Sequence, residues 1–161
     1  KLYKQNPNTK IKFVIIGGPK NLLDSLKQLG EEFGGNDIII FKDFVKREEI
    51  HNYFGALDLS MIQYSEVPWA NLAMPHKMAE GFAYGVPAIV RNFKERSEFV
   101  NKHKSGFIFS NPEPKMVAEA VSSFVDSNLI SKLSKNAKRE FENKLCWERQ
   151  VDKLTKMLDN L

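Results

Sequence analysis

The sequence predicts an α/β protein in which a parallel sheet is covered by helices on both faces, in three αβα layers. Two observations carry this prediction. Short runs of apolar, largely β-branched residues alternate along the chain with longer segments whose apolar residues recur at helical spacing. The short runs are apolar almost throughout, which is typical of strands buried on both faces and therefore of parallel sheets.

Several of the expected elements are bounded by glycine, asparagine or proline. Strands are expected at 11–16, 37–41, 59–63, 87–90 and 106–109. Helices are expected at about 20–33, 47–56, 75–84, 95–101, 114–126, 129–144 and 147–160. Ligands of such sheets bind at the carboxyl ends of strands, so Gly17-Gly18, Val45 and the irregular segment 64–77 are the candidate binding positions.

Length and charge restrict the class of function. The 161 residues fit one domain, and 42% hydrophobic and 27% charged residues are ordinary for a soluble protein. The net charge of +4 is not gathered into an arginine-rich tract with aromatics, which argues against nucleic-acid binding. It is compatible with an anionic small ligand, with a peripheral contact to an anionic membrane, or with an ordinary soluble surface.

The cysteine count and the hydropathy pattern favour a reducing compartment. Cys146 is the single cysteine and cannot form an internal disulfide. No apolar run approaches the roughly 20 residues that span a bilayer, and no signal-peptide pattern opens the chain. We therefore expect a cytoplasmic location, compatible with association of the full-length protein at a membrane.

The helix that opens at Pro75 is the strongest candidate for a binding element. Proline is favourable at the first helical position because the missing N–H would have no partner there. The free N–H groups and the dipole at this end attract an anion such as a diphosphate. Glu80, one and a half turns further along, is placed to accept hydrogen bonds from a ribose diol.

The helical wheel separates this helix into two faces. One face carries His76, Lys77, Glu80 and Tyr84, and the other carries Met78, Ala79 and Phe82. A lysine in the first turn opposes the helix dipole, and an incoming phosphate would relieve that conflict. The alternative is that Lys77 and Glu80 form a simple surface ion pair and that His76 is an ordinary exposed histidine.

The segment from Lys77 to Pro87 resembles the "K-x-x-E-x-x-A-x-G-x-P" signature of the family-4 (group 1) glycosyltransferases. Weaker matches follow in the expected order: 13–18, 41–45, 56–58, 98–100, 105–108 and 147–148. The resemblance covers about residues 11–160. It implies a Rossmann-like, doubly wound domain, the C-terminal, donor-binding half of a GT-B fold.

The resemblance also implies roles for single residues. Glu80 would bind the ribose of a nucleoside-diphosphate sugar, either UDP- or GDP-linked. The backbone from Ala73 through Met74, Pro75 and His76 to Lys77 would cradle the phosphates and the sugar, and backbone near Phe44 and Val45 would meet the base. Gly17 and Gly18 would allow the chain to approach the ligand closely. Transfer would retain the anomeric configuration and need no metal or cofactor, and the enzyme would be hexosyltransferase-like.

Three departures from the family pattern stand out. Leu72 occupies the place of a glutamate that contacts the donor sugar, and the nearest upstream acid is Glu66. Asp43 replaces a glycine after the second strand. The Arg and Lys that neutralise the diphosphate belong to a strand–helix unit for which residues 1–10 are too short. We therefore expect residues 1–161 to be the nucleotide-sugar-binding domain without its first strand–helix unit and without the N-terminal half that binds a sugar or lipid-linked acceptor, hence inactive alone.

The sequence contains no motif for the other kinds of binding or catalysis considered. There is no dinucleotide or Walker A motif, no metal-ligand spacing among His51, His76 and His103, and no nucleophile triad, so no catalytic residue or metal ligand is assigned. Cys146 is interpreted as a packing residue, and Trp69 either stacks on a ligand or fills an apolar gap. The last helix carries an apolar stripe, Val151, Leu154, Leu158 and Leu161.

Two other functions share the predicted fold. One is a non-catalytic Rossmann-like module that binds a nucleotide or phosphate. The other is an oligomerisation or regulatory domain that binds no nucleotide.

Overall fold

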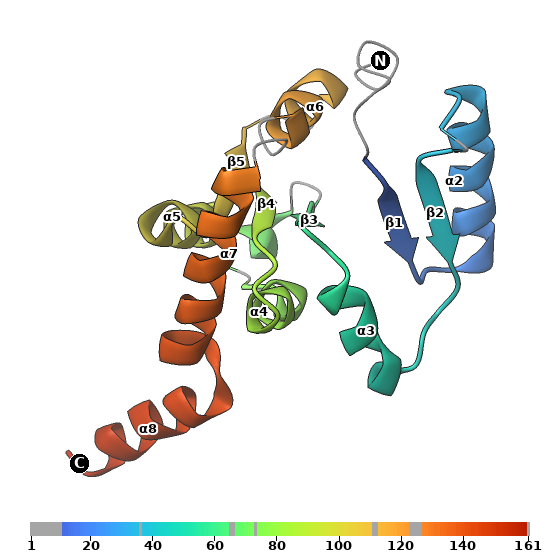
Figure 1. Cartoon of the computed structure of the whole chain (residues 1–161). Coiled ribbons are helices and arrows are strands. Elements are labelled where there is room, and N and C mark those ends of the chain that lie inside the picture. Colours follow the sequence, from blue (N-terminus) through green and yellow to red (C-terminus); the bar gives the residue numbers. More distant parts are fainter. Residues whose placement is uncertain are drawn as a thin grey trace. The chain divides into compact units, whose positions relative to one another are not determined.

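The computed structural model describes residues 11–35, 37–64, 67–72, 74–110, 113–122 and 127–160 (Figure 1). The chain divides into two compact units, Lys1–Tyr53 (unit 1) and Phe54–Leu161 (unit 2). None of the helices in these ranges is long and apolar enough to cross a membrane.

Unit 1 is built on a parallel pair of strands. Strand β1 (Phe13–Ile16) pairs with β2 (Ile39–Lys42), with Phe13 opposite Ile39. Helix α2 (Lys20–Glu32) connects them, as the helical spacing of its leucines predicts, and it buries Leu23 and Gly30. A short 3-10 turn, η1 (Arg47–Glu49), leads into α3 (Ile50–Gly55), which ends in unit 2.

Unit 2 holds a three-stranded parallel sheet in the order β3-β4-β5. The strands are β3 (Ser60–Ile62), β4 (Ala88–Arg91) and β5 (Gly106–Phe109). Between them lie η2 (Pro68–Asn71), α4 (His76–Ala83) and α5 (Lys94–His103), and after them come α6 (Pro114–Ser122), α7 (Ser127–Glu140), a π-helical segment, Phe141–Leu145, and α8 (Trp147–Leu158).

The centre of unit 2 confirms the predicted layers. Along β4, Ala88 and Val90 pack into a buried cluster with Met78 and Phe82 of α4. Ile89 points into a second cluster with Phe109 and Leu133, against which residues of α6 also pack. Because successive side chains of a strand point to opposite faces, helices cover β4 on both sides, and all four of its residues are buried.

Three details differ from the sequence-based expectation. The parallel pairing is confirmed, but the strands form two sheets instead of one, because no strand in the described ranges pairs with the outer edge of β1 or β3. Pro75 is the residue before α4 and not its first helical residue, since its ψ of 134° is extended. The helix expected at 129–144 changes at Phe141, whose carbonyl accepts from the N–H of Cys146, five residues on (2.9 Å).

Candidate functional site

In unit 1, two predicted binding positions lie together at the carboxyl ends of β1 and β2. Gly17 and Gly18 have φ values of 75° and 124°, which favour glycine. A Cβ on Gly17 would lie 3.5 Å from Cε1 of Phe44, so the backbone passes against this exposed ring. Val45, half-buried, follows directly. This corner offers a flat aromatic face and an unobstructed backbone.

In unit 2, the tip of α4 offers two backbone donors. The carbonyl of buried Pro75 accepts from the N–H groups of Met78 (2.9 Å) and Ala79 (3.4 Å). The N–H groups of His76 and Lys77 have no acceptor within the described part of the chain. These groups carry the partial positive charge of the helix dipole, which suits an anion.

The two faces of α4 are those that the helical wheel predicts. Met78, Gly81 and Phe82 are buried. The opposite face exposes His76, Lys77, Glu80 and Tyr84, and the Tyr84 ring stacks on Phe54 with 6.0 Å between centroids. Ala79, expected on the core side, is half-buried. Glu80 therefore presents its carboxylate to solvent on the same side as the helix tip.

Lys77 does not form the surface ion pair with Glu80 that the alternative interpretation requires. No salt bridge joins the two among the described residues. Instead, Nζ of Lys77 lies 4.9 Å from the ring centroid of Tyr64. Lys77 is exposed over part of its side chain, but the partial desolvation of its ammonium, and secondly the charge of Arg96, lower its pKa below the usual value. Lys77 thus meets a second cation and not an acid.

Arg96 is the main feature that the sequence-based analysis missed. It lies in the first turns of α5 with an exposed fraction of 0%. Its Nη2 donates to the carbonyl of Ala70 (2.8 Å), while Nε and Nη1 have no hydrogen-bond partner. Its Cζ lies 4.8 Å from the Tyr64 ring centroid and 4.6 Å from that of Phe93. The spacing of four to buried Val100 was the available signal, since it places Arg96 on the inner face of α5.

A third cation borders the same aromatic group. Arg91 ends β4, donates from Nη1 to the carbonyl of Tyr64 (3.2 Å), and has its Cζ 5.3 Å from the Phe93 ring centroid. Lys77, Arg91 and Arg96 therefore gather around Tyr64 and Phe93 at the carboxyl ends of β3 and β4. We call these five residues the cationic cluster.

The irregular segment before α4 contributes exposed apolar side chains. Trp69 is 56% exposed and meets the Tyr64 ring edge-on at 5.4 Å, so it fills no buried gap. Leu72 and Met74 are also exposed. Ala73 and Glu66, both named above from the family pattern, lie outside the described residues. The exposed surface beside the α4 tip is thus aromatic and apolar.

The sequence follows one protein family over most of its length. The family model described as "Glycosyl transferases group 1" matches residues 1–140. This chain belongs to the group 1 glycosyl transferases. No curated protein sequence matches it significantly.

Solved structures with the GT-B fold resemble this group 1 glycosyl transferase chain. HepE from Anabaena, solved in complex with UDP, aligns with a TM-score of 0.78 and 18% identity over 94% of this chain and 41% of HepE. Sucrose-phosphate synthase from Thermosynechococcus elongatus aligns with 0.74 and 17% over 91% of this chain and 38% of the synthase. The chain thus spans about two fifths of these two structures.

A third structure identifies the part of the fold. The C-terminal domain of a group 1 glycosyl transferase (LpcC) from Francisella tularensis aligns with a TM-score of 0.72 and 20% identity, over 90% of this chain and 74% of that domain. The group 1 glycosyl transferase chain therefore has the fold of a GT-B C-terminal domain.

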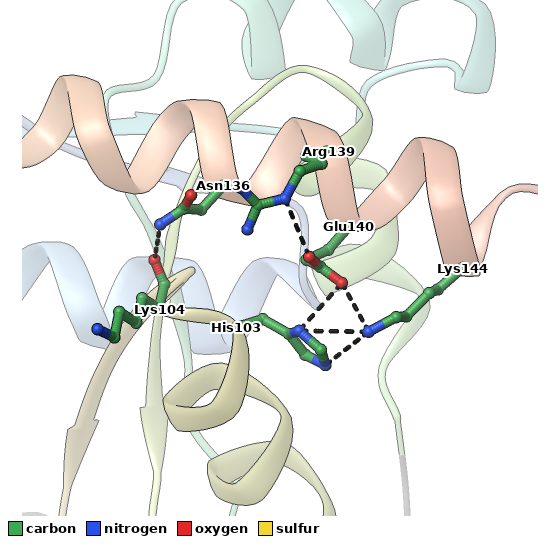
Figure 2. A network of polar contacts seen from close by, with 6 residues as sticks. All are labelled: His103, Lys104, Asn136, Arg139, Glu140 and Lys144. Atoms are coloured by element: carbon green, nitrogen blue, oxygen red, sulfur yellow. Dashed lines mark hydrogen bonds and ion pairs between the residues drawn. The ribbon is translucent and has the colours of Figure 1, made fainter.

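A separate polar network of this glycosyl transferase domain joins α5 to α7 and to the π-helical segment (Figure 2). His103 Nδ1 lies 3.1 Å from Glu140 Oε2, which also receives Nζ of Lys144 at 2.9 Å. The same Nζ lies 3.0 Å from Nε2 of His103, and Nε of Arg139 lies 3.3 Å from Glu140 Oε1. These contacts place Glu140 between His103, Lys144 and Arg139 as ion pairs, although Oε2 of Glu140 has no partner with hydrogen-bond geometry among the described residues.

The pKa values of His103 and Glu140 reflect their burial and these neighbouring charges. Burial is the largest cause that lowers the pKa of His103, against the opposing charge of Glu140. Burial acts to raise the pKa of Glu140, but the nearby cations Lys144 and Arg139 lower it overall. We interpret this network as structural, because its charged groups contact one another and lie on other elements than the α4 tip.

Proposed function

We propose that this chain is the donor-binding domain of a retaining, hexosyltransferase-like enzyme, which transfers a sugar from a nucleoside-diphosphate sugar to an acceptor. One observation carries the proposal: the tip of α4 presents two N–H groups, with no acceptor among the described residues, beside the exposed side chains of His76, Lys77 and Glu80. Anions bind such helix tips. The complexes of HepE with UDP and with UDP-glucose support a UDP-linked donor, with a GDP-linked donor as the variant to test.

Each residue then has a task. The backbone of Met74, Pro75, His76 and Lys77 holds the diphosphate, and Glu80 accepts hydrogen bonds from the ribose. In unit 1, Gly17, Gly18 and the backbone at Val45 serve the base. No residue of this chain is assigned a catalytic role, and no metal or cofactor is needed for the binding step.

The remaining parts of the enzyme lie outside this chain in our proposal. The chain spans only 38% and 41% of the two structures described above. The acceptor, a sugar or a lipid-linked sugar, would be held by the other half, so this fragment alone should not turn over donor.

The binding step can be tested on the chain as it stands. A ligand that binds only the folded state raises the melting temperature with its concentration. We expect millimolar UDP or GDP to raise it slightly, and uridine or guanosine to raise it less. Glu80→Gln should remove the additional shift that the nucleoside contributes over inorganic pyrophosphate.

The matched control is Glu148→Gln, an exposed acid on α8. It should leave every shift unchanged. If UDP, GDP and pyrophosphate all shift the melting temperature equally in the wild type, no nucleoside is recognised and the donor proposal fails. Turnover by the full-length enzyme with a panel of donor sugars then separates an enzyme from a non-catalytic binding module.

A further inference from the structure

Arg96, in the cationic cluster, is a buried charge with no anionic partner among the described residues. Arg96 is fully buried, makes one hydrogen bond to a carbonyl, and leaves Nε and Nη1 without acceptors. Within the described ranges no carboxylate forms an ion pair with it. An uncompensated buried charge destabilises a folded protein, and hydrogen-bonding groups of this kind are normally satisfied.

The buried charge of Arg96 lies close to Lys77, in the first turn of α4. Arg96 and Lys77 both lie over the Tyr64 ring, at 4.8 and 4.9 Å from its centroid. The carbonyl that holds Arg96 belongs to Ala70, in the segment that leads into α4. The two cations are close enough for Arg96 to act on the ionisation of Lys77. The fixed guanidinium of Arg96 and the exposed ammonium of Lys77 therefore share one aromatic ring next to the segment that leads into α4.

We propose that Arg96 is a positioning residue for the anionic group of the ligand. Lys77 and the α4 tip contact the oxyanion, and Arg96 supplies a second, fixed positive charge at the Tyr64 ring. The inference rests on the proposed function, because it concerns the same ligand, the anion bound at the α4 tip, and names a residue that neutralises its charge. Phosphate and carboxylate oxygens share the required chemistry, since both accept charge-assisted hydrogen bonds. The donor diphosphate and a carboxylate on the donor sugar are the two sources to separate.

A purely structural role predicts a different energetic signature. An arginine kept for packing and for the Ala70 carbonyl would stabilise the unliganded fold, and its removal would lower the melting temperature. An arginine kept for an anion destabilises the unliganded fold and stabilises the complex. The sign of the effect without ligand therefore distinguishes the two roles.

The test uses Arg96→Met, which keeps an unbranched apolar stem against Phe93 and Tyr64. Without ligand, we expect its melting temperature to rise by a few degrees. With inorganic pyrophosphate and with UDP, the upward shift should fall to less than about half of the wild-type shift, since one of the two cations is lost. Arg96→Lys, which retains the charge, should restore part of the shift. Arg149→Met, which removes an exposed arginine of α8, should leave the shifts intact.

Two donors separate the sources of the anion. If Arg96 serves the diphosphate, Arg96→Met weakens the shifts caused by pyrophosphate, UDP and UDP-glucose alike. If it serves a carboxylate on the sugar, only the shift caused by UDP-glucuronate weakens. Both results support the inference.

The inference is overturned if Arg96→Met lowers the unliganded melting temperature and leaves every anion-dependent shift at its wild-type size. It is also overturned if no anion shifts the wild type. Failure of the donor proposal gives a different result. Pyrophosphate would still raise the melting temperature of the wild type and not that of Arg96→Met. The nucleoside would add nothing to this shift, and Glu80→Gln would not change it.

Discussion

Unit 1 and unit 2 are both built from parallel strands connected by helices, but they bury their strands to different extents. In unit 1, two strands and one helix leave large apolar side chains exposed: Phe13, Leu22, Leu29, Phe33 and Ile40. In unit 2, β4 lies between two strands and under helices on both faces, and it is wholly buried. A two-stranded sheet has no central strand, so unit 1 depends on the packing of α2 against β1 and β2 for its stability. The free energy of folding must therefore reside mainly in unit 2.

The largest expected effect on stability comes from a glycine substitution in unit 2, which tests the comparison of the two units. A Cβ on Gly106 of β5 would lie 1.9 Å from the backbone oxygen of Ala88, its register partner in β4. Because backbone cannot yield as a side chain does, Gly106→Ala should lower the free energy of unfolding by about 4 kcal/mol or more. Urea denaturation followed by circular dichroism measures it.

The counterpart in unit 1 is Gly35→Ala. There the nearest atom to an added Cβ is the terminal Cδ1 of Ile39, at 2.9 Å, which can rotate away, although the Gly30 oxygen lies at 3.2 Å. The loss should be clearly smaller than for Gly106. Equal losses would mean that unit 1 is packed as tightly as unit 2.

A second pair of variants compares two phenylalanines, one in each unit. Phe82 of α4 is 0% exposed and Phe33, after α2, is 73% exposed. Phe82→Ala should cost about 3–5 kcal/mol, because it removes buried apolar area and leaves a cavity. Phe33→Ala should change the free energy of unfolding by within about 0.5 kcal/mol. A cost at Phe33 comparable to that at Phe82 would contradict the ranking of the two units.

The smallest expected effect concerns pH and the His103 network of unit 2. Since burial lowers the pKa of His103 in the folded chain, the unfolded chain binds more protons as pH falls below about 6.5. Stability is therefore full above this value and declines as pH falls toward the folded pKa. The lowered pKa of Glu140 adds a loss at still lower pH, below the ordinary glutamate value of 4.5.

Melting temperatures between pH 8 and pH 5 measure this dependence. His103→Gln keeps a donor and an acceptor but does not titrate, so it should flatten the decline. His51→Gln, on exposed His51 in unit 1, is the control and should leave the slope as it is. A decline that persists in His103→Gln would assign the pH dependence to other groups.

The fold was predictable where the signal was local. Apolar runs placed all five strands within about two residues, and the helical wheel identified the buried face of α4, with Met78 and Phe82. The π-helical segment was not predictable, because a single added residue within a turn leaves the apolar period almost unchanged. The division of the strands into two sheets was not predictable either, because the apolar period of a strand does not specify which strands pair.

The candidate site was predictable only in part. The α4 segment followed from Pro75 and from the helical spacing of His76 and Glu80. The cationic cluster joins Tyr64, Lys77 and Arg96, which are 13 and 19 residues apart along the chain and come together only through the strand order. A charged residue in a helix is normally expected in solvent, so burial of Arg96 contradicted the usual rule.

Helix α8 buries none of its own side chains against the described part of the chain. All its residues are exposed, including Trp147, Leu154, Met157 and Leu158. At 12 residues it is near the length below which an isolated helix melts in water. We therefore expect α8 to be fully helical only when its apolar side is covered. The helicity of residues 147–158 then reports whether that side is covered.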